Sequence, residues 1–119
     1  MVNKTATRYF STKQEKMVAK MVDGKRTANS GAAKLTGGDV YTEDTLYECK
    51  TVMNPVKSYS VKKAVLDKVR QEAFALRKRN YAMVFNFEPD GECFYVLPQK
   101  YYTELLEYYK ENNEWVPYR

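Results

Sequence analysis

The sequence predicts an α/β fold in which a central mixed β-sheet is flanked by helices. Helical and strand-like periodicities alternate along the chain in the order helix, strand, strand, helix, strand, strand, helix. A strand followed by a long helix and another strand is typical of sheets that carry helices on their faces. The length of 119 residues, with 44% hydrophobic and 29% charged residues, suits one globular domain over residues 1–119.

The first part of the chain is predicted to contain a helix between two irregular segments. Residues 1–10 are interpreted as a basic, loosely held arm. A capping box that begins at Ser11 or Thr12 can open the helix, and the Asp-Gly pair at 23–24 is typical of a helix end. The small, polar and glycine-containing segment 25–38 is predicted to be a surface loop.

The rest of the chain alternates pairs of short strands with helices. Strands are predicted in two pairs, each joined by a four-residue turn: 39–41 with 46–52, and 81–87 with 92–97. A long helix is predicted over 58–79, because its apolar residues share one arc at 100° per residue. A last helix is predicted over about 98–112, opened after Pro98.

Composition excludes several classes of function. The formal charge of +5 and the pI of about 9.1 favour a polyanionic partner. The chain has no histidine, which removes Ser-His-Asp and Cys-His catalysis and His-ligated metals. Cys49 and Cys93 fit no zinc spacing and are interpreted as buried free thiols in a reducing cytoplasm. We expect no membrane association, because no apolar run approaches 18 residues and the N-terminus lacks a signal-peptide pattern.

Asp39, Glu48 and Lys50 form the candidate catalytic centre. Alternate residues of a strand share a face, so Glu48 and Lys50 lie side by side, and pairing through the TEDT turn brings Asp39 near Glu48. Two close carboxylates repel unless a cation or proton is shared. Oxygen ligands of this kind suit Mg²⁺ or Mn²⁺, and Lys50 would then assist a metal-bound water or a developing charge. The alternative is an ordinary solvated ion pair.

The surroundings of these residues resemble the PD-(D/E)XK nuclease superfamily. Asp39 followed nine residues later by Glu48-Cys49-Lys50 matches its signature, and within the superfamily the chain looks most like the Holliday-junction-resolvase-type branch of archaea and bacteriophages. The matching segments are QEKMVAKMVDGKRTANSGAAKLTGGDV, YECKT and the QEA of the basic helix. The resemblance covers about residues 11–97 and implies a restriction-endonuclease-like core. Gly38 stands where the superfamily name has proline, as is common in this branch.

The resemblance implies a metal-dependent DNA endonuclease that hydrolyses phosphodiester bonds at Holliday junctions or other branched DNA. Asp39, Glu48 and the Cys49 backbone carbonyl would bind Mg²⁺, with Mn²⁺ as a substitute. Lys50 would be the catalytic lysine, and Glu15 would complete the site. From the residues alone, Glu15 can equally be a capping-box glutamate. Cutting two strands needs two sites, so a homodimer is implied, and phage origin would place it in the host cytoplasm.

Two basic segments supply the predicted DNA-binding residues. Residues 57–79 hold eight lysines and arginines against two acids, and three of these cations, spaced by seven, are predicted to form one row for duplex phosphates. The loop 25–38 is predicted to hold phosphates as well. The candidates are Lys25, Arg26, Ser30, Lys34, Lys62, Lys63, Arg70 and Arg77. A solvated helix face and an ordinary mobile loop are the alternatives.

Other functions remain open. A nuclease that acts on flap, nicked or single-stranded DNA would use the same residues. A non-catalytic nucleic-acid-binding or phage regulatory protein on a nuclease-like fold is a rival from another class. The tyrosine band on the last predicted helix suits base stacking, a core or a subunit interface.

Overall fold

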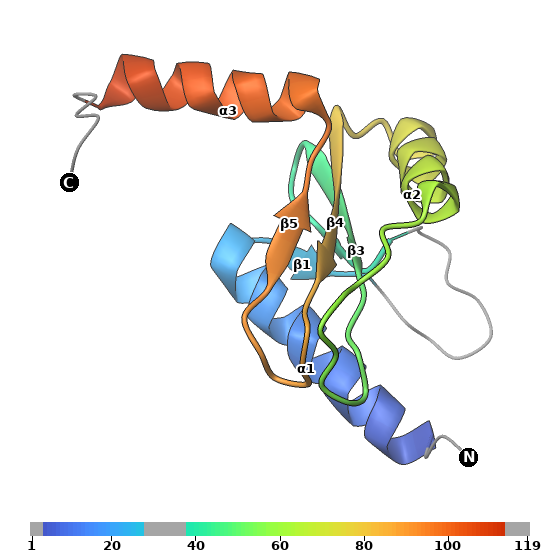
Figure 1. Cartoon of the computed structure of the whole chain (residues 1–119). Coiled ribbons are helices and arrows are strands. Elements are labelled where there is room, and N and C mark those ends of the chain that lie inside the picture. The colour runs from blue at the N-terminus through green and yellow to red at the C-terminus, as the bar shows by residue number, and fades with distance from the viewer. Residues whose placement is uncertain (1–3, 28–37, 114–119) are drawn as a thin grey trace.

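The structure is a computed structural model that describes residues 4–27 and 38–113. Over these residues a five-stranded mixed sheet carries three helices, which confirms the predicted α/β class (Figure 1). The elements are α1 (Lys4–Val22), β1 (Lys25–Arg26), β2 (Val40–Tyr41), β3 (Thr45–Cys49), α2 (Lys63–Ala75), β4 (Asn80–Phe85), β5 (Phe94–Val96) and α3 (Gln99–Asn112).

The strands lie in the sheet in the order in which they occur along the chain, β1-β2-β3-β4-β5. β3 and β4 are parallel, with Glu48 opposite Met83, and α2 is the crossover between them. The other neighbouring strands are antiparallel. A parallel pair needs such a long connection, whereas the antiparallel pair β2–β3 needs only the short turn after Tyr41.

The observed order contains one strand more than the predicted order. Lys25 and Arg26, which we expected in a loop, pair with β2. A two-residue strand is too short to show a period of two, and only tertiary pairing reveals it. The loosely held arm is also corrected, because α1 begins at Lys4. Residues 4–10 contain no glycine or proline that would stop a helix.

The C-terminal ends of α1 and α2 share one backbone motif. As predicted, α1 ends before Asp23, which takes the left-handed φ of 55°, and the Gly24 amide donates to the Ala19 carbonyl at 2.8 Å. Together with the bond from the Asp23 amide to the Lys20 carbonyl at 3.4 Å, this bond forms a Schellman cap. Gly24 has no room for a side chain, because a Cβ there would lie 2.6 Å from the Tyr41 carbonyl oxygen.

α2 is shorter than the helix predicted over 58–79. Lys62, at its N-cap, is still extended at φ −87° and ψ 129°. At the other end Arg77 takes the left-handed φ of 57°, and the Lys78 amide donates to the Ala73 carbonyl at 2.8 Å. This second Schellman cap ends the helix without a glycine, which is why the periodicity did not reveal it.

The core is split between the two faces of the sheet. α1 packs on one face, over a buried cluster of Val18, Val40, Tyr47, Ala82 and Val84. α2 packs on the other face, over Leu46, Val69 and Ala73. Neighbouring residues of β3 therefore enter opposite clusters, which confirms the predicted alternation. α3 extends away from the end of the sheet and has no buried residue (Figure 1).

Both cysteines are free and half-buried. Within the described residues, no helix is long and apolar enough to cross a membrane.

Candidate active site

Asp39 directly precedes β2 and lies across from Glu48. Val40 pairs with Tyr47, and one step further along the same antiparallel register Asp39 is opposite Glu48. The Asp39 amide donates to the Tyr47 carbonyl at 2.8 Å. The Cys49 amide donates to Asp39 Oδ2 at 2.8 Å. The aspartate carboxylate is therefore held against the backbone of the strand that carries the glutamate.

The backbone before Asp39 has a conformation that favours glycine. Gly38 has a φ of 71°, and a Cβ there would lie 2.6 Å from two side-chain carbons of Leu46. Proline cannot adopt this φ, because its ring holds φ near −65°. The local geometry thus requires glycine at position 38. Thr27 holds the segment by donating its hydroxyl to the Gly38 carbonyl at 3.1 Å.

Glu48 is a buried carboxylate next to a partly exposed cation. It is 6% exposed and shares the α2 face of β3 with Leu46. Lys50 Nζ lies 3.6 Å from Glu48 Oε2, and the lysine side chain is 42% exposed. The predicted juxtaposition of these two side chains is confirmed. An ammonium that reaches from solvent to a buried carboxylate can also interact with a negatively charged ligand at the same place.

The backbone of Lys50 is fixed from two sides. Its amide donates to the Val84 carbonyl at 2.8 Å, and its carbonyl accepts from Gln14 Nε2 at 2.8 Å. Gln14 is 5% exposed, on the inner face of α1. This residue was not predicted to belong to the site. Its only signal was a polar side chain four residues before the buried Val18 on the same helix face.

Glu15 lies in the middle of α1, so the capping-box interpretation is wrong. Its Oε1 accepts from Nε and Nη2 of Arg26, both at 3.3 Å. Glu15 and Arg26 side chains are 19% and 32% exposed. This ion pair links α1 to β1, so the positive charge of Arg26 is paired within the protein.

Three carboxylates act on one thiol. Burial raises the pKa of Cys49, and the negative charges of Asp39, Glu15 and Glu48 raise it further, in that order. These are the three carboxylates that the sequence predicts for the catalytic centre. Their joint effect on one side chain shows that the fold gathers negative charge around residue 49, where a cation would be stabilised.

The metal that the resemblance implies is Mg²⁺, with Mn²⁺ as a substitute. Among residues 4–27 and 38–113, no group of three Asp, Glu, Cys or His side chains is arranged to hold a metal ion. Mg²⁺ is commonly held by one or two carboxylates together with waters and substrate phosphates. Asp39 and Glu48, opposed across β2 and β3, are a donor pair of that kind. By donor type this pair suits Mg²⁺, whereas Glu15 is engaged by Arg26.

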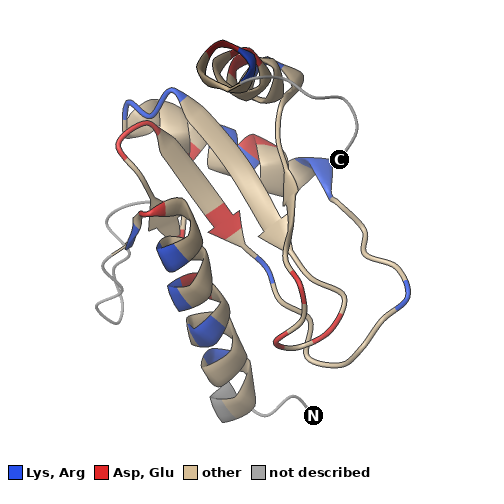
Figure 2. Ribbon diagram, turned by 90° about the vertical axis from the view of Figure 1, so that its left-hand side faces the viewer, with Lys and Arg blue, Asp and Glu red and all other residues tan. Residues whose placement is uncertain are grey.

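The predicted DNA-binding residues fall into three groups. Five of them are exposed: Lys25, Lys62, Lys63, Arg70 and Arg77. Arg26 is half-buried and paired with Glu15. Ser30 and Lys34 lie outside the described residues. Figure 2 shows Lys and Arg residues on α2, on α1 and on the connection between α2 and β4.

The predicted row of three cations on α2 is corrected. Lys63 and Arg70 lie on the helix seven residues apart, but Arg77 follows the helix end in the left-handed conformation. Lys63 Nζ contacts Asp67 at 2.8 Å, as an exposed i, i+4 ion pair. The continuous helical face available to a polyanion therefore ends at Arg70.

A second basic surface was not predicted. Arg8, Lys13 and Lys16 line a shallow groove on α1 with Tyr9 and Thr12. Arg8 and Tyr9 lie within residues 1–10, which were predicted to be a loosely held arm and are helical instead.

No family model, curated protein or solved structure matches this chain.

Proposed function

We propose that this protein is a metal-dependent DNA endonuclease with a restriction-endonuclease-like core. It hydrolyses phosphodiester bonds in branched DNA, with Holliday junctions as the leading substrate. The observation that carries the proposal is the placement of Asp39 opposite Glu48, with Lys50 Nζ 3.6 Å from Glu48. Two opposed carboxylates with an adjacent ammonium match the chemistry of phosphodiester hydrolysis, which needs a divalent ion and a cation near the developing charge.

Each residue has a distinct role in this proposal. Asp39 and Glu48, with the Cys49 carbonyl, would hold Mg²⁺ or Mn²⁺, which lowers the pKa of a bound water and polarises the phosphoryl group. The Cys49 amide keeps the Asp39 carboxylate oriented. Lys50, partly exposed, reaches the scissile phosphate and stabilises its charge. Glu15 acts indirectly, by holding Arg26 and adding negative charge near the site.

DNA is held by the exposed cations of α2 and β1, through phosphates and shape. Lys62, Lys63, Arg70 and Lys25 would contribute to backbone contacts without reading bases. A homodimer would present two such centres, as the cutting of two strands in one junction requires.

The first test is cleavage by the purified protein with Mg²⁺. Labelled four-way, flap, nicked, duplex and single-stranded DNA are compared, with EDTA as the metal-free arm. We expect symmetric nicks in the four-way junction and no cutting in EDTA. Cutting of flap or single-stranded DNA alone would replace the substrate class. Tight binding without any cutting would select the non-catalytic alternative, which the absence of a three-ligand metal group among the described residues favours.

The second test assigns the chemistry to Lys50. Lys50→Ala should abolish cutting and leave junction binding within a few-fold, because the ammonium acts at the reacting phosphate. Lys57→Ala is the matched control, since Lys57 is an exposed lysine outside the centre. Wild-type cleavage by Lys50→Ala would refute the role of this lysine.

A further inference from the structure

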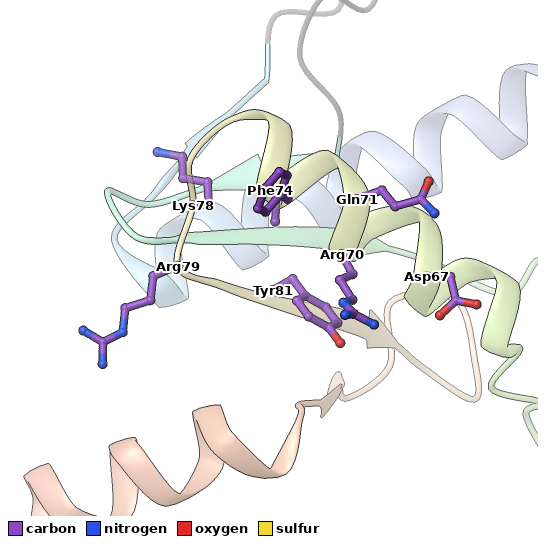
Figure 3. A pocket seen from close by; sticks show the side chains of 8 residues that line it. Asp67, Arg70, Gln71, Phe74, Lys78, Arg79 and Tyr81 are labelled. Atoms are coloured by element: carbon purple, nitrogen blue, oxygen red, sulfur yellow. The ribbon is translucent and has the colours of Figure 1, made fainter.

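A groove lies beside α2, and its lining includes none of the carboxylate-centre residues Asp39, Glu48 and Lys50. Its volume is about 640 Å³, and its walls come from α2, the start of β4 and the segment between them. Figure 3 shows Asp67, Arg70, Gln71 and Phe74 on α2, with Tyr81 on the strand below and Lys78 and Arg79 on the connection. The four helical residues follow the spacing i, i+3, i+4, i+7, so they form one face of the helix.

Phe74 is the unusual residue of this face. It is 85% exposed, the largest exposure among the large hydrophobic side chains of the described residues. A single exposed hydrophobic residue is ordinary on a protein surface. Here, however, the ring borders a groove that also contains the half-buried aromatic ring of Tyr81. Two aromatic side chains from different elements thus border one open space.

The charges of the groove are positive and partly uncommitted. The Arg70 side chain is exposed and makes no ion pair or hydrogen bond with other described residues. Arg79 is oriented by Glu104 of α3 at 2.9 Å and its side chain is still 66% exposed. Lys78 Nζ is tied to the carbonyls of Thr42 and Glu43. The single acid, Asp67, is paired with Lys63.

We propose that this groove binds a short stretch of single-stranded nucleic acid. Cations that follow the phosphates, together with aromatic side chains on which bases stack, are the features of single-strand binding sites. The bases of an intact duplex are stacked on one another, so only an unpaired base can lie against Phe74. Arg70 and Arg79 would hold the flanking phosphates. The groove shares Arg70 with the surface proposed for duplex phosphates. Its binding of an unpaired base does not depend on whether the carboxylate centre cuts DNA.

The test measures binding without cleavage. Fluorescence anisotropy in EDTA compares a labelled oligonucleotide of roughly ten thymidines, the matching uridine oligonucleotide and a duplex. Phe74→Ala should weaken single-strand binding by about 5- to 150-fold, the range given by loss of one stacked base, and leave duplex binding unchanged. Phe74→Trp, which keeps an aromatic ring at this position, should bind single strands like the wild type. Because Phe74 is 85% exposed, these variants are expected to fold normally.

Two matched controls accompany Phe74. Tyr108→Ala removes an aromatic ring that is 67% exposed on α3 and does not line the groove. Lys68→Ala removes an exposed cation of α2 that also lies outside the groove lining, against which Arg70→Ala is compared. Both controls should bind like wild type.

The outcomes separate cleanly. Equal losses on thymidine and uridine strands support recognition of base and phosphate alone, and a loss on only one of them supports the proposal with a sugar preference. Unchanged single-strand binding by Phe74→Ala would overturn the proposal, as would an equal loss on single strands and duplex. If Phe74→Ala changes the mass measured by light scattering but not oligonucleotide binding, the groove is a protein interface instead.

Discussion

At the scale of single residues, Asp39 owes its position to backbone contacts. Its carboxylate accepts from the Cys49 amide, and its carbonyl accepts from the Thr27 amide at 3.0 Å. The chain reaches it through Gly38, whose left-handed conformation no bulky residue adopts easily. The orientation of a charged side chain is thus set by neighbours that carry no charge, and such residues are open to mutational tests that leave the carboxylates intact.

Gly38→Ala should therefore damage both stability and the site. The left-handed conformation costs a non-glycine residue roughly 1–2 kcal/mol, and the new Cβ would overlap Leu46, which is fully buried. We expect a loss of at least about 1 kcal/mol in the free energy of unfolding, measured with urea, together with reduced cutting. Gly91→Ala is the control, because its φ lies outside the left-handed region and its Cβ would mainly meet the side chain of Glu88. Equal losses for both variants would contradict this account.

The buried phenol of Tyr47 should make the free energy of unfolding depend on pH in the alkaline range. The residue is 6% exposed, and burial, helped by a hydrogen bond with Tyr101, raises the pKa of its phenol. A raised pKa means that the folded state keeps the proton longer than the unfolded chain. The stabilisation is complete below the unfolded pKa of about 10 and is lost as the pH rises above it.

The test compares the wild-type protein with Tyr47→Phe in urea unfolding from pH 8 to 11. Above pH 10 the free energy of unfolding should fall more steeply for the wild type, by up to about 1.4 kcal/mol per pH unit. Tyr47→Phe should show a flatter decline, since it has no phenol to ionise. Parallel curves would show that another group causes the alkaline loss. Tyr108→Phe, at a residue that is 67% exposed, serves as the control.

At the scale of elements, the sequence predicted the pairing of two strands where a short connection allows only one register between them. The TEDT turn joins β2 to β3, so the placement of Asp39 across from Glu48 followed from spacing alone. Contacts between distant segments were out of reach, as the Arg26–Glu15 pair and the Gln14 bond to Lys50 show. Their sequence patterns are those of ordinary surface or helix residues, and only tertiary packing brings them to the site.

The ends of α2 could not be predicted from the sequence either. Periodicity continues through Arg77, because local composition there remains helical in character, yet a left-handed residue closes the helix at Leu76. This cap is formed by backbone hydrogen bonds that the carbonyls of Phe74 and Ala73 accept. It contains no glycine that would mark it in the sequence. The boundary matters for function, because it decides which cations share one helical face.

The corrected boundary yields a prediction about salt dependence. Arg70→Gln should lower the slope of log K against log salt for binding to a four-way junction by about one unit, because one phosphate contact is lost. Arg77→Gln should leave the slope close to the wild-type value, since Arg77 is off the helix. Titrations are done in EDTA between low and physiological salt. An equal decrease for both variants would restore the three-cation row that the spacing alone predicted.

At the scale of the whole molecule, α3 is the element least explained by a single chain. It has 14 residues and none of them is buried. Isolated helices of this length are marginal in water. Tyr101 and Glu104 tie its first turns to the sheet, through Thr45 at 3.1 Å and Arg79 at 2.9 Å. The remaining turns extend from the body, as Figure 1 shows.

The exposed face of α3 is strongly apolar. Tyr102, Leu105 and Tyr109 follow the spacing i, i+3, i+7 and are 54%, 45% and 48% exposed. The acidic residues Glu107 and Glu111 fall on the opposite arc. A helix with this pattern gains stability when its apolar face is covered, and the homodimer proposed for two-strand cutting would supply the cover.

Leu105→Glu tests this assignment, because it places a charge at the centre of the apolar face while retaining helix propensity. We expect light scattering to show a dimer for the wild type and a monomer for Leu105→Glu. The monomer should lose paired nicking of a four-way junction and keep the fold of the sheet, seen in an unchanged far-ultraviolet dichroism spectrum. Glu107→Gln, on the opposite arc, should remain dimeric. A wild-type protein that is monomeric at every concentration, yet nicks both strands, would separate the cutting of branched DNA from dimerisation and leave α3 to a different partner.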